Sequence, residues 1–261
     1  MTDAKREYPE GTSRRSFLSK GLAVGAGVVG AGVLGSPMIT LLSKRTFCRV
    51  VALMGIIGTL MIGASFGVNP GAQPGATNAQ LIAFGRAHFT SILCGAWLQA
   101  VGPLLIILFA FSIVQLAGAT QRLSGLMTFF GGAVLMMVSL TEVVFYISAL
   151  YTTPATMAIV SNDIAHAVQH LYFIVTAPSL FVPLGIVILT SSILPRFLGY
   201  LALLLGTTFA ILGVISLYSL YLPSSVTALA AIQALWWVAA AIALNRPSKH
   251  CAGCQHARSL S

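Results

Sequence analysis

The strongest constraint on the fold of this chain is a series of long apolar stretches, each long enough to cross a lipid bilayer. A helix needs about 20 apolar residues to span about 30 Å of hydrocarbon. Lipid offers no partner to backbone groups, and the stretches are too long for the strands of a membrane barrel. We therefore predict an all-α polytopic membrane bundle of about six transmembrane helices. The stretches are 49–68, 90–116, 125–150, 164–193, 198–221 and 226–244.

Acidic residues are too scarce for a soluble domain of this size. The chain has 261 residues, of which 57% are hydrophobic and 7% charged, and its net charge is +9. Only five residues are acidic, and after Glu10 only Glu142 and Asp163 remain. A water-exposed surface normally carries many more carboxylates. We therefore expect the lipid bilayer to surround the chain, and the basic residues to orient it there rather than to bind nucleic acid.

The basic residues lie at alternate ends of the six stretches. Residues 69–89 contain a single Arg, and residues 151–163 and 222–225 contain no Lys or Arg. Loops rich in Lys and Arg stay in the cytoplasm. We predict a multi-pass protein of the bacterial cytoplasmic (inner) membrane, with both ends of the six-span domain, 44–245, and the polar C-terminal tail, 246–261, in the cytoplasm. The residues that set this orientation are Lys44, Arg45, Arg49, Arg122, Arg196, Arg246, Lys249 and Arg258.

The N-terminal segment, 1–43, carries a different signal. It reads "SRRSFLSK" over residues 13–20 and continues into the mildly apolar run "GLAVGAGVVGAGVLG". This resembles a bacterial twin-arginine export signal, and the resemblance implies the twin-arginine translocase as a partner. The signal residues are Arg14, Arg15, Phe17 and Leu18.

This leader conflicts with the orientation of the core. If residues 21–42 crossed the membrane once, the basic residues that follow would lie outside, and every later loop would be inverted against its charge. The alternatives are a start at Met38, a fused or non-spanning leader, and an ordinary membrane anchor flanked by basic residues.

The odd-numbered stretches of the core begin alike. Arg49, Arg122 and Arg196 stand at their starts, at nearly equal intervals along the chain. This spacing favours three tandem helical hairpins of one orientation. The simpler alternative is that each cytoplasmic helix start carries a basic residue.

Proline and turn residues predict irregularities within this pattern. Pro103 should bend the second stretch, and Pro178 and Pro183 the fourth, each freeing a carbonyl group. The polar run "NPGAQPGATNAQ", 69–80, is typical of a connector. The next residues, "LIAFGRAHF", 81–89, predict a short helix at the membrane surface.

Polar side chains within the apolar stretches fall at one depth. Counting 1.5 Å per residue from the ends of the stretches places them in the outer half of the membrane. Ionisable groups there are costly and face a partner or the bundle interior. We predict an outer-half polar chamber in which Glu142 meets a histidine of the fourth stretch, the two either sharing a proton or bonding as neutral groups. Its members are Gln99, Glu142, Tyr146, His166, His170 and Gln233.

Three of the polar residues share one helix face. Asp163, His166 and His170 follow each other at steps of three and four. Asp163 also stands where the fourth stretch begins, so it is either the N-cap of that helix or a ligand. A bond between Glu142 and a histidine could equally serve only to fix helix packing.

The same residues suggest a metal site as an alternative. Asp163, His166 and His170, with Glu142, form a ligand set that suits zinc. The set distantly resembles membrane hydrolases of the alkaline ceramidase type, although the further histidine and the serine expected in those enzymes cannot be assigned. We expect no cofactor, with zinc as the leading alternative. A haem held by His88 and a histidine of the fourth stretch is a weaker one.

The C-terminal tail offers a second, weaker set of metal ligands. Covalent c-type haem needs a histidine directly after the second cysteine, and Gln255 occupies that position. This set of residues therefore suits a zinc ion better than a haem. The candidate residues are His250, Cys251, Cys254 and His256.

The core also resembles a family of bacterial multi-pass membrane proteins that is grouped as a domain of unknown function. The phrases that carry the resemblance are "FCRVVALMGIIGT", "AWLQAVGPLLI", "TEVVFYISALY" and "AHAVQHLYFIV". It implies no activity. We expect a non-enzymatic membrane protein whose chamber binds a small molecule, ion or proton, as a transporter, sensor or accessory subunit. The alternatives are a membrane-embedded metal-dependent hydrolase and a purely structural role for the polar residues.

Overall fold

The computed structural model describes residues 44–69, 77–151, 155–218 and 224–245. Within these ranges the regular structure is entirely helical. The described residues between Cys48 and Asn245 belong to one compact unit. The helices are α3 (Lys44–Val68), α4 (Asn78–Ala87), α5 (Phe89–Leu116), α6 (Leu123–Tyr151), α7 (Ala155–Leu171), the π-helix η1 (Tyr172–Thr176), α8 (Ala177–Leu189), α9 (Arg196–Ser216) and α10 (Ser224–Asn245).

Six helices in the described part of the chain are long and apolar enough to cross a membrane. This confirms the predicted all-α polytopic bundle. The fourth span is composite, because α7, the π-helix and α8 run on from Ile159 to Leu189 as one helix. It begins earlier than the sequence suggested.

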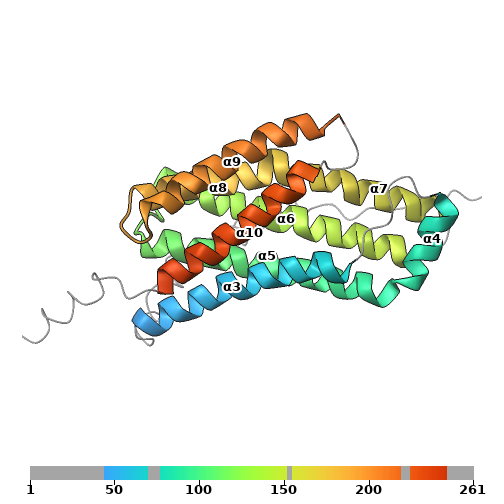
Figure 1. The fold of residues 1–261 in the computed structure, drawn as a ribbon, viewed down its shortest axis with the longest axis horizontal. Coiled ribbons are helices and arrows are strands. Elements are labelled where there is room, and N and C mark those ends of the chain that lie inside the picture. The colour runs from blue at the N-terminus through green and yellow to red at the C-terminus, as the bar shows by residue number, and fades with distance from the viewer. Residues whose placement is uncertain (1–43, 70–76, 152–154, 219–223, 246–261) are drawn as a thin grey trace, which may run out of the picture. The chain divides into compact units, whose positions relative to one another are not determined.

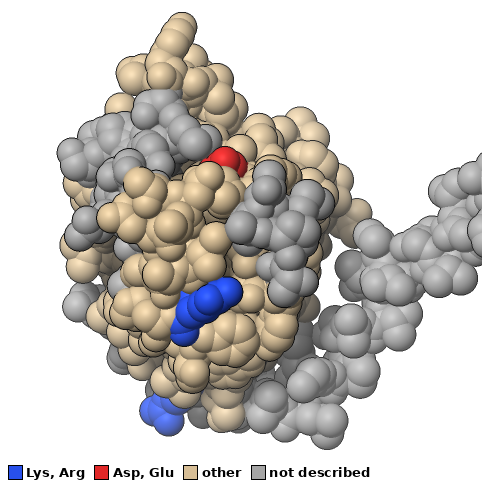
Figure 2. Space-filling view, turned by 90° about the vertical axis from the view of Figure 1, so that its right-hand side faces the viewer, with Lys and Arg blue, Asp and Glu red and all other residues tan. Residues whose placement is uncertain are grey.

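Two ends of the bundle can be distinguished in Figure 1. The turns that join α5 to α6 and α8 to α9 lie at one end, and the short helix α4 lies at the other. We call these the turn end and the α4 end. Between them α6 packs against α5, α7 and α8, while α9 packs against α8 and α10. Seen from the α4 end, the surface carries only scattered charged side chains (Figure 2).

The helix α4 begins earlier than predicted. The segment 69–80 was expected to be a connector throughout, but α4 starts at Asn78. Thr77 is its N-cap and forms a capping box with Gln80: the Gln80 side chain accepts a hydrogen bond from the Thr77 N–H at 2.8 Å. This reciprocal pair satisfies N–H groups that would otherwise lack partners, so the helix starts there.

The fourth span also begins before the residue expected to cap it. Asp163 lies well inside α7, which starts at Ala155. The interpretation of Asp163 as the N-cap was therefore wrong. The physical reason is that residues 155–162 contain neither Gly nor Pro, so nothing in them ends a helix. Asp163 is instead an exposed residue on the surface of α7.

The π-helix joins the two parts of the fourth span. Ala177 N–H donates to the carbonyl of Tyr172, five residues earlier, so this turn holds one residue more than an α-helical turn. Pro178 follows directly; it lacks an N–H, and its ring disfavours a regular turn before it. On α9, Gly213 makes room for this turn, since a Cβ atom there would lie 2.8 Å from the carbonyl carbon of Phe173.

The core on the α8 side is aromatic. Phe181 of α8 is fully buried, and its ring centroid lies 5.1 Å from that of Trp237 and 5.2 Å from that of Trp236. Phe209 of α9 completes the group, with its centroid 6.4 Å from that of Phe181. Trp236 also donates its indole N–H to the carbonyl of Leu198 at 2.9 Å. These contacts hold α8, α9 and α10 together.

Candidate functional site

Glu142 is the centre of a polar cluster among three helices. It lies on α6, nearer to the α4 end, and only 8% of its surface is exposed. Gln99 of α5 donates from its side-chain amide to Oε2 of Glu142 at 2.5 Å. Gln169 of α7 donates in the same way to Oε1 at 2.6 Å. Each carboxylate oxygen therefore has an amide partner from a different helix.

Two further residues of α6 extend this cluster. The hydroxyl of Tyr146, one turn after Glu142, accepts a hydrogen bond from the amide of Gln169 at 2.8 Å. Ser139, one turn before Glu142, donates to the carbonyl of Gln99 at 2.8 Å. We call Gln99, Ser139, Glu142, Tyr146 and Gln169 the Glu142 cluster. It connects α5, α6 and α7.

The partners of Glu142 are all uncharged. An ionised carboxylate within a membrane is costly unless donors compensate for its lost water, and the two amides are such donors. A glutamine amide also carries an oxygen, so a rotation of the amide group turns the donor into an acceptor. The cluster can therefore satisfy Glu142 both as a carboxylate and as a neutral carboxylic acid.

The structure corrects the predicted partner of Glu142. A histidine of the fourth span was expected there, but Gln169 takes this place. His170 is buried and its Nδ1 lies 3.1 Å from the hydroxyl oxygen of Ser216 on α9. Nδ1 of His166 lies 2.9 Å from the carbonyl oxygen of Asn162, within α7 itself.

Gln233 of α10 lies in a separate contact. Its side-chain oxygen accepts a hydrogen bond from the hydroxyl of Tyr172 at 2.7 Å. Three nearby residues of the fourth span thus contact three different helices. Gln169 contacts α6, His170 contacts α9 and Tyr172 contacts α10. The predicted chamber is therefore divided into one cluster around Glu142 and two separate pairs.

The predicted chamber did not include Ser139 and Gln169, and it also lacked two partners outside the Glu142 cluster, Ser216 and Tyr172. Neither differs in type from many other residues of the spans, and a single Ser or Tyr in an apolar stretch carries no signal of its own. Gln169 was visible as a polar residue beside the histidines. Only the geometry of the helix decides that it, and not a histidine, faces α6.

The candidate metal ligands are not brought together. In the described parts of the chain, no three residues among His, Cys, Asp and Glu are placed so as to hold one ion. Asp163 is exposed, and His88 lies between α4 and α5 with its ring centroid 4.5 Å from that of Phe84. The tail ligands and the residues of the twin-arginine-like signal lie outside the described ranges.

Fold and cluster together define a polytopic α-helical membrane protein with a buried carboxylate that accepts hydrogen bonds from neutral donors on two neighbouring helices. No family model matches the chain. No match was found among curated proteins or among solved structures.

Proposed function

We propose that this protein binds and releases a proton at Glu142, as part of a transporter, sensor or accessory subunit of the bacterial cytoplasmic membrane. The observation that carries the proposal is the enclosure of Glu142 by uncharged groups. These groups can form hydrogen bonds with Glu142 whether it is ionised or protonated. A residue that only fixed helix packing would not require a carboxylate, since a glutamine can form the same contacts.

The topology supports this role in the membrane. The basic residues gather at the start of α3, between α5 and α6, at the start of α9, and after α10. By the positive-inside rule these parts face the cytoplasm, which places both the C-terminus and the turn end there. Glu142 then lies nearer to the outer surface, within reach of protons from that side.

Infrared difference spectroscopy at changing pH tests the proposal directly, because a protonated carboxyl group absorbs at a frequency that the ionised form lacks. The chain suits this method, since it has only five acidic residues. We expect the full-length protein to show a carboxyl band that titrates with pH. The band should vanish in Glu142→Gln and remain in Asp163→Asn.

Two results would contradict the proposal. One is a Glu142 band that does not change over the whole pH range in which the protein stays folded. The other is a band that belongs to Asp163 alone. Either would leave Glu142 with a structural role only.

A second measurement separates transport from binding. The protein is reconstituted into vesicles that contain a pH-sensitive dye, and a potential is imposed across the membrane. Proton entry that requires Glu142 indicates a transport path. A titrating band without proton entry indicates a sensor or an accessory subunit.

A further inference from the structure

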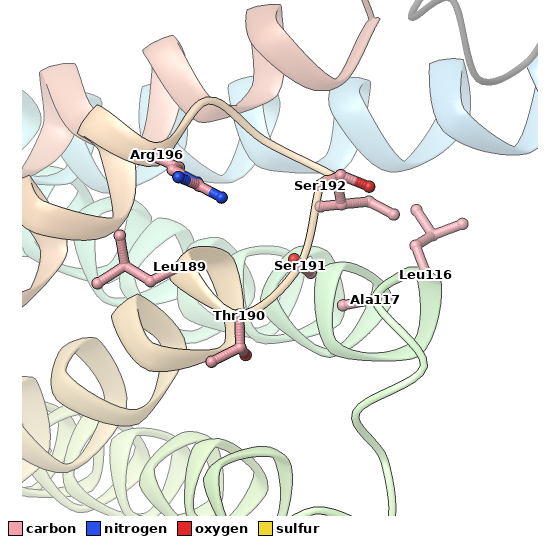
Figure 3. A pocket seen from close by; sticks show the side chains of 8 residues that line it. Leu116, Ala117, Leu189, Thr190, Ser191, Ser192 and Arg196 are labelled. Carbon is pink, nitrogen blue, oxygen red and sulfur yellow. The ribbon is translucent and has the colours of Figure 1, made fainter.

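The turn end of the bundle contains a cavity that the Glu142 cluster does not explain. Its volume is about 430 Å³. It lies between the end of α5 and the connection from α8 to α9, and Figure 3 shows both walls. The residues relevant to its chemistry are Leu116, Ala117, Thr190, Ser191, Ser192 and Arg196.

Arg196 is the charged residue of this cavity. It begins α9, and in Figure 3 its side chain points toward the stretch of the connection that holds Ser191 and Ser192. A guanidinium group presents several N–H donors in a planar fork, which matches the oxygens of a phosphate. The Ser191 hydroxyl donates to the carbonyl of Ile188 over a long 3.4 Å, a weak bond that a phosphate oxygen could replace.

Within the described ranges, no carboxylate lies near Arg196 at this end. After Glu10 the sequence has only two acidic residues, Glu142 and Asp163. Glu142 is enclosed by its cluster, and Asp163 lies on α7, toward the α4 end. Arg196 is exposed, and no described residue neutralises it, so its guanidinium group is available to an anion from another molecule.

The position of the cavity favours a lipid as that molecule. It lies where α5 and α8 end and α9 begins, the level at which a membrane span meets the headgroups. Next to Arg196, α9 exposes Phe197, Tyr200 and Leu204, which are 58%, 63% and 61% exposed. Their spacing of three and four residues forms one apolar face along α9. A phosphate held by Arg196 would place its acyl chains along this face.

We propose that the Arg196 cavity binds the phosphate group of an anionic phospholipid. The proposal does not depend on proton binding at Glu142. It assigns to Arg196 a ligand contact in addition to any effect of its charge on orientation.

Native mass spectrometry of the full-length protein tests this site. The protein is purified in mild detergent with a mixture of phosphatidylglycerol and phosphatidylethanolamine, and the lipids that remain bound are counted. We expect phosphatidylglycerol to be retained, and Arg196→Gln to lower its apparent affinity about tenfold, as the loss of a charge-assisted contact would. Arg196→Lys, which keeps the charge but loses the fork, should fall between the two.

Arg122→Gln is the matched control, because Arg122 is an exposed arginine in the neighbouring turn that does not line the cavity. It should retain the lipid as the unchanged protein does. An equal loss in both variants would overturn the proposal, because the effect would then come from overall charge. So would equal retention of both lipids by the unchanged protein.

A second arm distinguishes a lipid from free phosphate. Inorganic phosphate is titrated into the protein by calorimetry and added as a competitor in the lipid experiment. We expect neither heat nor competition at millimolar concentration. Binding of inorganic phosphate that requires Arg196, without lipid retention, would overturn the assignment to a lipid.

Discussion

The two parts of the fourth span contact their neighbours in different ways. In α7, Gln169 and His170 contact α6 and α9 through polar groups. In α8, Phe181 packs among the aromatic rings of Trp236, Trp237 and Phe209. Aromatic packing contributes stability through a large buried area. Hydrogen bonds weaken steeply when their geometry is distorted, so the polar contacts of α7 depend on the register of the span.

The π-helix between these parts sets that register. It holds one residue more than the α-helical turn it replaces. If the span were a regular α-helix as far as α8, every residue before the π-helix would be shifted by one position. His170 would then occupy the place of Gln169, because each residue turns the helix by about 100°. The extra residue therefore determines that an amide faces Glu142, and that the histidine faces Ser216 instead.

The largest contrast is expected between two single-residue deletions. Deleting Val175 from the π-helix makes Tyr172 the fourth residue before Ala177, so the existing hydrogen bond closes an ordinary α-helical turn. The residues before it keep their places. Deleting Leu140 from the regular helix α6 instead rotates Glu142 by about 100° relative to the earlier turns. Both residues are 42% exposed, so neither deletion removes a core side chain.

A disulfide reports which deletion keeps the register. The hydroxyl oxygens of Ser148 on α6 and Ser161 on α7 lie 3.2 Å apart, so cysteines at both positions should pair. With the native cysteines replaced, we expect the bond to form with and without Val175. The Leu140 deletion should lose the bond, or more than about 3 kcal/mol of stability. A Val175 deletion that behaves like the Leu140 deletion would show that the π-helix does not absorb one residue.

The next largest effect is expected in the aromatic core. Phe181→Ala leaves a cavity beside Trp236 and Trp237, and we expect it to lower the free energy of unfolding by about 3 kcal/mol. Phe130→Ala is the control, because Phe130 is 61% exposed on α6. It should change stability by less than about 0.5 kcal/mol. Reversible unfolding in mixed micelles measures both, and equal losses would show that α8 does not depend on this packing.

A smaller loss is expected in the Glu142 cluster. Glu142→Ala removes the acceptor of two interhelical amides, at about 0.6 kcal/mol or more for each hydrogen bond in a membrane, so we expect a loss of about 1.5 kcal/mol. Glu142→Gln retains one acceptor oxygen and should lose less than about 1 kcal/mol. The same unfolding measurement applies. If the glutamine variant loses as much as the alanine variant, stability depends on the charge of Glu142 and not on its shape.

The sequence predicts the helical bundle well because a bilayer imposes a length. Each span must hold about 20 apolar residues, and the gaps between such runs locate the turns. The first residues of α7 and α4 were not predicted, because both helices begin in sequence of mixed polarity. The helix α7 begins at Ala155, and α4 begins after the capping box of Thr77. Such ends depend on local hydrogen bonds and not on hydropathy.

The site is only partly visible in the sequence, for a physical reason. Depth along the spans identifies Gln99, Glu142 and Tyr146 correctly as neighbours. The rotation of the fourth span about its own axis cannot be predicted in this way, because one additional residue in a π-helix rotates every residue that precedes it. Pro178 indicates that the helix is irregular there, but not that it gains a residue. It is therefore easier to predict which residues lie at the same depth than to predict which side chain of the fourth span faces them.

The smallest effect is expected at a residue of the π-helix itself. It tests where the polar contacts of α7 end and the apolar packing of α8 begins. Thr176 is fully buried, and its hydroxyl has no hydrogen-bond partner among the residues that the structure describes. A buried hydroxyl without a partner is unfavourable, whereas an apolar group of the same shape avoids that penalty. We therefore expect Thr176→Val to raise the free energy of unfolding by about 1 kcal/mol.

Thr128→Val is the matched control for Thr176. Thr128 of α6 is equally buried, but its hydroxyl donates to the carbonyl of Ser124 at 2.8 Å. Its replacement should lower stability by about 0.5–1 kcal/mol, since a hydrogen bond is lost. Opposite signs for the two variants, measured by unfolding in the same detergent, would show that the fourth span continues into α8 by apolar packing alone. A loss in both would mean that the Thr176 hydroxyl has a partner in the folded protein, so that polar contacts extend from α7 through the π-helix.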